Sequence, residues 1–186
     1  MTKIYYDTEF HERGAGWPID FISIGMHTEG GRELYAISSE FDTDAVLANP
    51  WLVRNVWPHL PTFKHGEGIE CGPGHLDRDH PDVRPRAAIA RMVEEFVLEE
   101  PDPLLVAWYG SYDHVVFAQL WGRMIDLPAG IPMWTYDLRQ EVHRLGLTSD
   151  DLPEQEEGLH NALVDARHNR VVDEYLDTVR AQRGHA

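Results

Sequence analysis

Residues 3 to 10 read Lys3-Ile4-Tyr5-Tyr6-Asp7-Thr8-Glu9-Phe10, and this stretch decides how the rest of the chain is interpreted. It predicts a short β-strand with two acids, Asp7 and Glu9, two positions apart. Because side chains alternate along a strand, both carboxylates project from one face of the sheet. Neighbouring carboxylates repel each other and cost desolvation free energy unless a cation neutralises them or water reaches them. The stretch is therefore a candidate site for a hard divalent metal ion.

The composition offers a simpler explanation of this pair. Asp and Glu make up 32 of the 186 residues, so an Asp-x-Glu spacing often arises by chance. Partners elsewhere in the chain are needed to support a metal site.

Length and composition indicate one domain over residues 1–186, since 42% hydrophobic residues suffice for a real core, and the order of its predicted elements makes it an α/β domain. A single cysteine, Cys71, excludes an internal disulfide framework and fits a reducing compartment. The amino terminus lacks the apolar run of a secretory signal, and the apolar stretch Leu104 to Tyr109 is too short to span a bilayer. We expect a cytoplasmic protein with no membrane partner.

The formal net charge of −16 disfavours a protein that wraps duplex nucleic acid, because such binding relies on many Lys and Arg contacts to phosphate. A protein that grips only a chain end through metal-bridged phosphate needs few basic residues. The acidity thus favours metal-dependent chemistry or no nucleic acid at all.

Hydrophobic patterns predict a mixed sheet flanked by helices. After the first strand, strands over 19–26 and 33–38, joined at Gly30-Gly31, complete an antiparallel three-strand meander. A helix with apolar residues from Ile89 to Val97 precedes a buried strand over 104–109. A helix follows Gly110, then a strand over 133–137, a helix to about 144, an acidic surface loop over 148–158 and a last helix over 161–182. The core face of that last helix includes His168 and Val171.

Prolines and glycines concentrate at about 50–86, which predicts a long loop of the kind that often serves as a lid. Within it, Cys71, His75 and His80, with His65 as a fourth ligand, raise the alternative of a zinc-stabilised interaction domain. Their spacing matches no compact zinc motif.

Asp113 stands in the first turn of the predicted helix after Gly110. Apolar residues follow it at helical spacing on the same face, namely Val116, Phe117, Leu120, Trp121 and Met124. A carboxylate on a buried face needs a metal ion, a salt-bridge partner or a role in capping the helix. The capping interpretation remains open from the sequence.

The last helix begins with His160-Asn161-Ala162-Leu163-Val164-Asp165. Residues five apart on a continuous helix do not share a face, so a site common to His160 and Asp165 requires His160 to lie just before the helix, with Asn161 as its cap. An ordinary loop histidine is the alternative.

These four acids and the histidine resemble, in order and context, the DEDDh family of 3′-to-5′ exonucleases, which have a ribonuclease H-like fold. The closer resemblance is to the mycobacterial-type polyadenylate-specific 3′ exoribonuclease. Its segments are similar to DTEF at 7–10, SEFD at 39–42, YDHVVFAQLWG at 112–122 and HNALVDAR at 160–167.

The resemblance implies a catalytic site of Asp7, Glu9, Asp113, Asp165 and His160. The four acids would hold two divalent cations, Mg²⁺ or Mn²⁺, through carboxylate oxygens, and His160 would be the general base on a water molecule. It also implies a homodimer that acts on single-stranded RNA 3′ ends, adenylate-rich ones among them, and releases nucleoside 5′-monophosphates.

Substrate contacts are expected from Thr8, Glu9, Phe10 and Trp17, with the aromatic rings stacking on the last bases, whereas Trp108 is expected in the core. Two alternatives stay open. One is a DEDDh exonuclease for DNA ends or short oligonucleotides, and the other is a non-catalytic ribonuclease H-like binding module.

Overall fold

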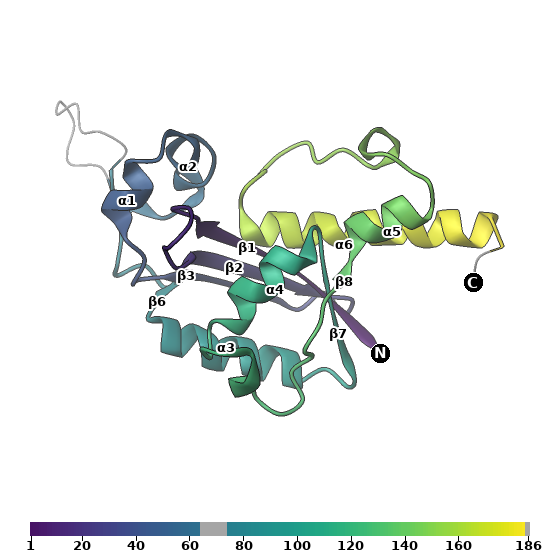
Figure 1. Cartoon of the computed structure of the whole chain (residues 1–186), viewed down its shortest axis with the longest axis horizontal. Helices are drawn as coiled ribbons and strands as arrows, with labels where there is room; N and C mark the ends of the chain where they lie inside the picture. Colours follow the sequence, from purple (N-terminus) through teal and green to yellow (C-terminus); the bar gives the residue numbers. More distant parts are fainter. Residues whose placement is uncertain (64–73, 185–186) are drawn as a thin grey trace.

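The computed structural model describes residues 1–63 and 74–184 (Figure 1). The strands are Thr2–His11 (β1), Asp20–Thr28 (β2), Glu33–Ser38 (β3), Thr62–Phe63 (β4), His75–Leu76 (β5), Val83–Arg84 (β6), Pro103–Ala107 (β7) and Tyr136–Asp137 (β8). The helices are Thr43–Leu47 (α1), Pro50–Asn55 (α2), Arg86–Leu98 (α3), Gly110–Ala118 (α4), Leu138–Arg144 (α5) and Ala162–Gln182 (α6), with short 3₁₀ turns at Trp57–His59, Met124–Asp126 and Ser149–Asp151.

Within these residues, a mixed six-stranded sheet has the strand order β6-β3-β2-β1-β7-β8, and β4 and β5 form a separate two-stranded sheet. The long strand β1 pairs antiparallel with β2, which pairs antiparallel with β3, while β7 lies parallel to β1. Helices α3 and α4 cover one face of the large sheet, and α5 and α6 lie over the other (Figure 1).

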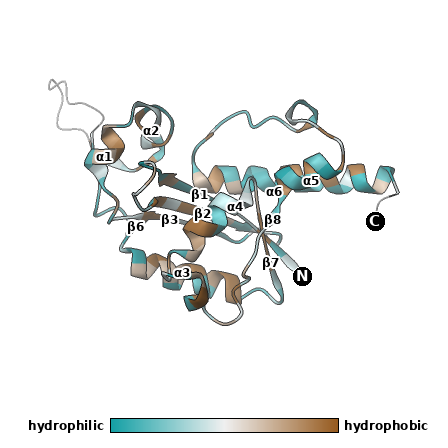
Figure 2. Cartoon of the chain, in the orientation of Figure 1, coloured by the Kyte–Doolittle hydropathy of each residue, from teal (hydrophilic) through white to brown (hydrophobic). Residues whose placement is uncertain are grey.

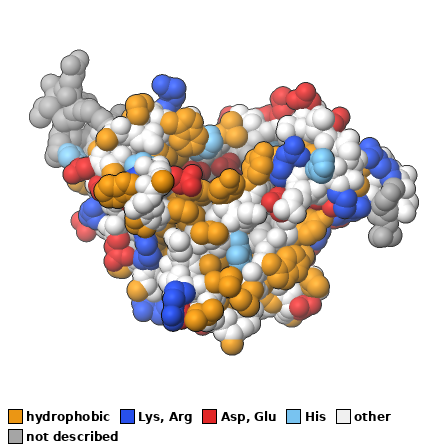
Figure 3. All heavy atoms as spheres, in the orientation of Figure 1, with side chains coloured by type: hydrophobic (Ala, Val, Ile, Leu, Met, Phe, Trp, Pro, Cys, Tyr) orange, Lys and Arg blue, Asp and Glu red, His pale blue; other side chains and the backbone are white. Residues whose placement is uncertain are grey.

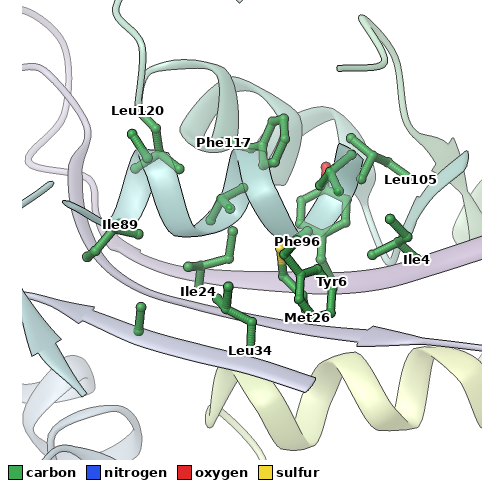
Figure 4. Close-up of a cluster of buried hydrophobic side chains, with 14 of the residues drawn as sticks. Ile4, Tyr6, Ile24, Met26, Leu34, Ile89, Phe96, Leu105, Phe117 and Leu120 are labelled. Atoms are coloured by element: carbon green, nitrogen blue, oxygen red, sulfur yellow. The ribbon is translucent and has the colours of Figure 1, made fainter. Parts of the chain in front are cut away.

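Alternation along β1 divides the core into two layers. Ile4 and Tyr6 pack with Phe96 of α3 and Phe117 of α4 on one face (Figure 4). Tyr5 faces the opposite side, where side chains of α5 and α6 cover it. In Figure 2, α3 carries more brown than the longer α6, which has much teal along its length. The sheet is thus covered on both faces, and its central strand β1 buries apolar side chains on each of them.

The stretch at about 50–86 contains more regular structure than the long loop predicted from its composition. Asn49 accepts hydrogen bonds from the backbone N–H groups of Trp51 and Leu52 and so caps α2. Pro50 occupies the first turn, where a missing N–H costs nothing. Further along, β6 adds an edge strand to β3. The loop prediction is wrong for these segments because proline was interpreted only as a breaker.

Three other predictions need correction. The helix that carries Asp113 ends at Ala118, and Met124, which shares its helical spacing, is exposed in the following 3₁₀ turn. The strand expected over 133–137 is limited to Tyr136–Asp137, the residues that pair with β7. Val171, placed on the core face of the last helix, is 46% exposed, because the buried face of α6 runs through its neighbour Val172.

No helix in the described part of the chain has the length and apolar character needed to cross a bilayer.

Candidate active site

The two acids of β1 lie where the strand extends beyond its parallel neighbour. Strand β7 pairs with β1 only from Thr2 to Tyr5, and its chain then turns away into α4. Asp7 and Glu9 follow this paired segment and lie on the same face as Tyr5. The edge of β1 next to them is therefore open to side chains that arrive from α4 and α6.

Asp113 of α4 is 5% exposed, and one of its carboxylate oxygens binds β1. This Oδ1 accepts hydrogen bonds from the backbone N–H of Thr8 at 2.9 Å and from the Thr8 hydroxyl at 2.7 Å. The carboxylate therefore joins α4 to β1. It is not the N-cap of its helix, a position that Tyr109 occupies.

Asn161 caps α6, as predicted, by accepting hydrogen bonds from the backbone N–H groups of Leu163 and Val164. His160 lies just before the helix with φ of 66°, in the left-handed region. This conformation lets the His160 backbone N–H donate to Oδ2 of Asp165 at 2.9 Å. A strained backbone thus places the histidine beside the acid of the next helical turn.

All five predicted catalytic residues line one pocket of about 990 Å³. One ligand atom from each of Glu9, His160 and Asp165 can be chosen so that the three lie within 4.8 Å of one another, the only such group of acids, histidines and cysteines among the described residues. This geometry allows the imidazole as a third metal donor, whereas the sequence interpretation makes it the general base. Asp7 and Asp113 line the same pocket outside that group of three.

Burial raises the pKa values of all four carboxyl groups of the site. Burial is the largest cause for each. Repulsion from Asp113 and Glu9 adds to it at Asp7, whose pKa is well above the usual range. The pKa of Glu9 is raised to about 8, also by Asp165, and that of Asp113 to about 7 despite the hydrogen bonds from Thr8. Burial also raises the pKa of Asp165, and the hydrogen bonds from Gln155 and the His160 N–H act in the opposite direction.

This donor set fits hard divalent cations. Carboxylate oxygens are the ligands that Mg²⁺ and Mn²⁺ prefer. A cation that replaces the protons of clustered acids with raised pKa values also neutralises the repulsion between their carboxylates. The zinc alternative depends on Cys71 and His65, which lie outside the described residues.

The expected substrate residues have different surroundings. Thr8 and Phe10 line the pocket, although the Thr8 hydroxyl is engaged by Asp113 and Phe10 also packs on the core. Trp17 lies outside the pocket, 62% exposed, with the Arg13 guanidinium 5.4 Å from its ring centre. Trp108 packs against the core beneath α5 and α6, as expected, but also lines the pocket.

Two residues that approach the catalytic group were not predicted. Gln155 donates from Nε2 to Oδ1 of Asp165 at 2.5 Å, although it belongs to the acidic loop interpreted as solvated surface. The ring of Trp51, on α2, meets the His160 ring edge to face with 4.8 Å between centroids. Both contacts join residues from separate elements, and no local pattern indicates them.

The fold and the pocket together define an α/β protein with a carboxylate-rich site at the end of its central strand. No protein-family model matches the chain. Two curated proteins, each named 3′-5′ exoribonuclease and coming from two strains of Mycobacterium tuberculosis, are 38% identical to it over 167 residues. The aligned part covers 89% of this chain and 87% of theirs. The chain belongs to the family of these 3′-5′ exoribonucleases.

Proposed function

We propose that this chain is a 3′-to-5′ exoribonuclease of the DEDDh type, with a ribonuclease H-like fold and two bound Mg²⁺ or Mn²⁺ ions. Its substrate would be the 3′ end of single-stranded RNA, including adenylate-rich ends, and its products nucleoside 5′-monophosphates. The observation that carries this proposal is the meeting of Asp7, Glu9, Asp113, Asp165 and His160 in one pocket. Membership of the exoribonuclease family supports the same activity.

Asp7, Glu9, Asp113 and Asp165 would hold the cations. When bound, two divalent cations lower the pKa of an attacking water and neutralise charge on the phosphate and the leaving oxygen. The chain's own residues do the remaining work. Thr8 holds Asp113 in place through two hydrogen bonds, and Gln155 and the His160 N–H hold Asp165.

We assign His160 as the general base, because an imidazole nitrogen can accept a proton from water and hard cations prefer oxygen donors. Its backbone bond to Asp165 and the edge contact with Trp51 restrict where the ring can lie. The ring would accept the proton of the attacking water, and Phe10 would pack against the terminal base.

The test is digestion of an oligoadenylate RNA with Mg²⁺ or Mn²⁺ by the wild type and by Asp165→Asn. We expect stepwise release of AMP from the 3′ end by the wild type and a loss of about 10²-fold or more in kcat for the variant, since a ligand is removed without a change of shape. Glu95→Gln, which neutralises an exposed acid on α3, is the matched control and should behave as wild type.

Three outcomes would count against the proposal. Intact RNA and digested DNA of the same sequence would shift the assignment to DNA ends. No digestion of either, with no Mn²⁺ binding in a titration, would favour the binding module. Equal activity of the wild type and Asp165→Asn would show that this pocket is not the active site.

A further inference from the structure

A second hollow adjoins the catalytic pocket. Its volume is about 940 Å³, and it lies between the start of α4, strand β8 and α5. Tyr109 and Tyr112 line both hollows, so the two hollows adjoin each other with these residues at the junction, and we refer to the two together as the depression. Nothing in the catalytic assignment uses the second hollow.

Exposed aromatic rings follow this depression. Tyr109 is 52% exposed, Tyr112 is 58% exposed, and Trp134 in the second hollow is 55% exposed. A single exposed ring needs no explanation, but three along one path form a series of flat apolar surfaces. The backbone of Tyr109 is left-handed, with φ of 53°, a conformation that costs free energy in a non-glycine residue. Such rings stack on nucleic-acid bases without regard to sequence.

The second hollow also holds cationic groups. Arg139 lines it, and its guanidinium forms no hydrogen bond or ion pair within the part of the chain that the structure describes. Arg144 and His143 lie beside it, and Figure 3 shows blue and pale-blue side chains gathered over α5. A chain of net charge −16 thus presents an uncompensated guanidinium next to exposed rings, an arrangement suited to a phosphate.

The acids of the same hollow already have partners. Asp137 caps α5 by accepting hydrogen bonds from the backbone N–H groups of Arg139 and Gln140. Glu141 accepts two bonds of 2.7 Å from Arg144 and one of 2.9 Å from Arg180. Glu141 is therefore paired with two arginines and Asp137 with backbone donors, and among the described residues neither acid forms an ion pair with Arg139.

A third hollow, on another side of the catalytic pocket, is less suitable for phosphates. This hollow of about 340 Å³ shares Thr8, Glu9, Phe10 and Glu12 with the catalytic pocket. Among the described residues that line it, acids are present and Lys and Arg are absent. A polyanion that leaves this way would meet repulsion without a compensating cation.

We propose that the RNA chain upstream of the 3′ end leaves the catalytic pocket over Tyr109 and Tyr112 and enters the second hollow. There a base stacks on Trp134 and a phosphate binds the Arg139 guanidinium. This inference rests on the proposed function. It adds the path of the substrate and makes the second hollow a binding site for nucleotides that are not cleaved in that turnover.

The test compares Trp134→Ala and Arg139→Gln with wild type on two substrates, a diadenylate and an oligoadenylate of about ten nucleotides. We expect KM for the longer RNA to rise about tenfold in each variant, while hydrolysis of the diadenylate stays unchanged, because only the longer chain reaches the second hollow. Arg91→Gln removes an exposed arginine from α3, a helix that contributes no residue to either hollow, and is the matched control.

Binding gives a second readout that does not need turnover. Fluorescence anisotropy of the labelled oligoadenylate, measured in an Asp165→Asn background, should show weaker binding for both additional substitutions. For Arg139→Gln, the slope of log Kd against log salt concentration should fall by about 0.7, as expected for one lost phosphate contact to a single strand.

These assays distinguish failure of the proposed RNA path from failure of the proposed exoribonuclease activity. If the wild type digests both RNAs and neither variant changes KM or Kd for the longer one, the path is refuted and the exoribonuclease stands. Equal losses on both substrates would also refute it, because they indicate a general defect. If the wild type digests neither RNA, the proposed function fails, and unchanged anisotropy in the variants then refutes the path separately.

Discussion

Replacing Gly25 with alanine should displace the start of α6, because this glycine lies directly beneath it. Gly25 pairs with Asp7 across β1 and β2. A Cβ atom at this position would lie 2.1 Å from the backbone N of Leu163 and 2.2 Å from the carbonyl carbon of Ala162. All these neighbours are backbone atoms, so no side chain can rotate away. The helix and the sheet must separate.

The size of the effect follows from these distances. Ordinary contacts of a Cβ atom begin near 3.4 Å, so the helix start must move by more than about 1 Å. Overpacking of this kind costs about 3 kcal/mol of unfolding free energy, at the upper end of the usual range, because both surfaces are rigid. Asp165 and His160 flank Leu163, and a shift of 1 Å in such groups costs about 10²-fold in rate.

Urea unfolding and oligoadenylate digestion measure the two effects. Gly30→Ala is the matched control, since a Cβ there meets only the Thr28 hydroxyl at 3.7 Å. We expect Gly30→Ala to differ little from wild type in either assay. If Gly25→Ala retained wild-type stability and wild-type kcat, the close packing of α6 on β2, and its role in placing Asp165 and His160, would be refuted.

Three further predictions concern single side chains. His160→Gln should lower kcat by about 10² to 10⁴-fold while Mn²⁺ affinity, measured by calorimetry, stays close to wild type, as expected for a general base. Gln155→Ala should weaken Mn²⁺ binding by about 10 to 100-fold, because Asp165 loses a donor that orients it. Glu141→Gln should lower the free energy of unfolding by about 1–3 kcal/mol at pH 7, since Arg144 and Arg180 lose a charged acceptor.

The pH dependence of the last variant has a defined sign. Hydrogen bonds from Arg144 lower the pKa of Glu141 below its model-peptide value of 4.5. A lowered pKa stabilises the fold above the unfolded pKa, and that stability is lost as pH falls through the folded pKa. The difference in free energy of unfolding between wild type and Glu141→Gln, measured by urea titration, should therefore become smaller below about pH 4.5. A difference of constant size would contradict the ion-pair explanation.

Mn²⁺ binding also tests the His160→Gln and Gln155→Ala predictions. Loss of Mn²⁺ binding in His160→Gln would make the imidazole a ligand rather than the base. For Gln155→Ala, the control is Gln119→Ala, an exposed glutamine at the end of α4. Equal Mn²⁺ affinity in both variants would show that the hydrogen bond to Asp165 does not support metal binding.

The sequence predicted the main elements because their patterns are local. Strand alternation placed Asp7 and Glu9 on one face, helical spacing placed Asp113 on a buried face, and an Asn161 cap placed His160 just before the last helix. Each prediction depends on periodicity or capping within about ten residues. The loop predicted for the proline-rich stretch was wrong because composition is also local information. Helix α2 and strand β6 are stabilised by contacts with β2 and β3 that composition does not show.

Only the tertiary structure decided which residues surround the catalytic group. Gln155 and Trp51 reach Asp165 and His160 from separate elements, and Tyr109 and Trp134 become neighbours along one depression only after α4 and β8 pack at the same end of the sheet. The sequence by itself determined the chemical groups and their local direction. The distances between them depend on how segments far apart in the chain pack across the sheet, and no local sequence pattern encodes that packing.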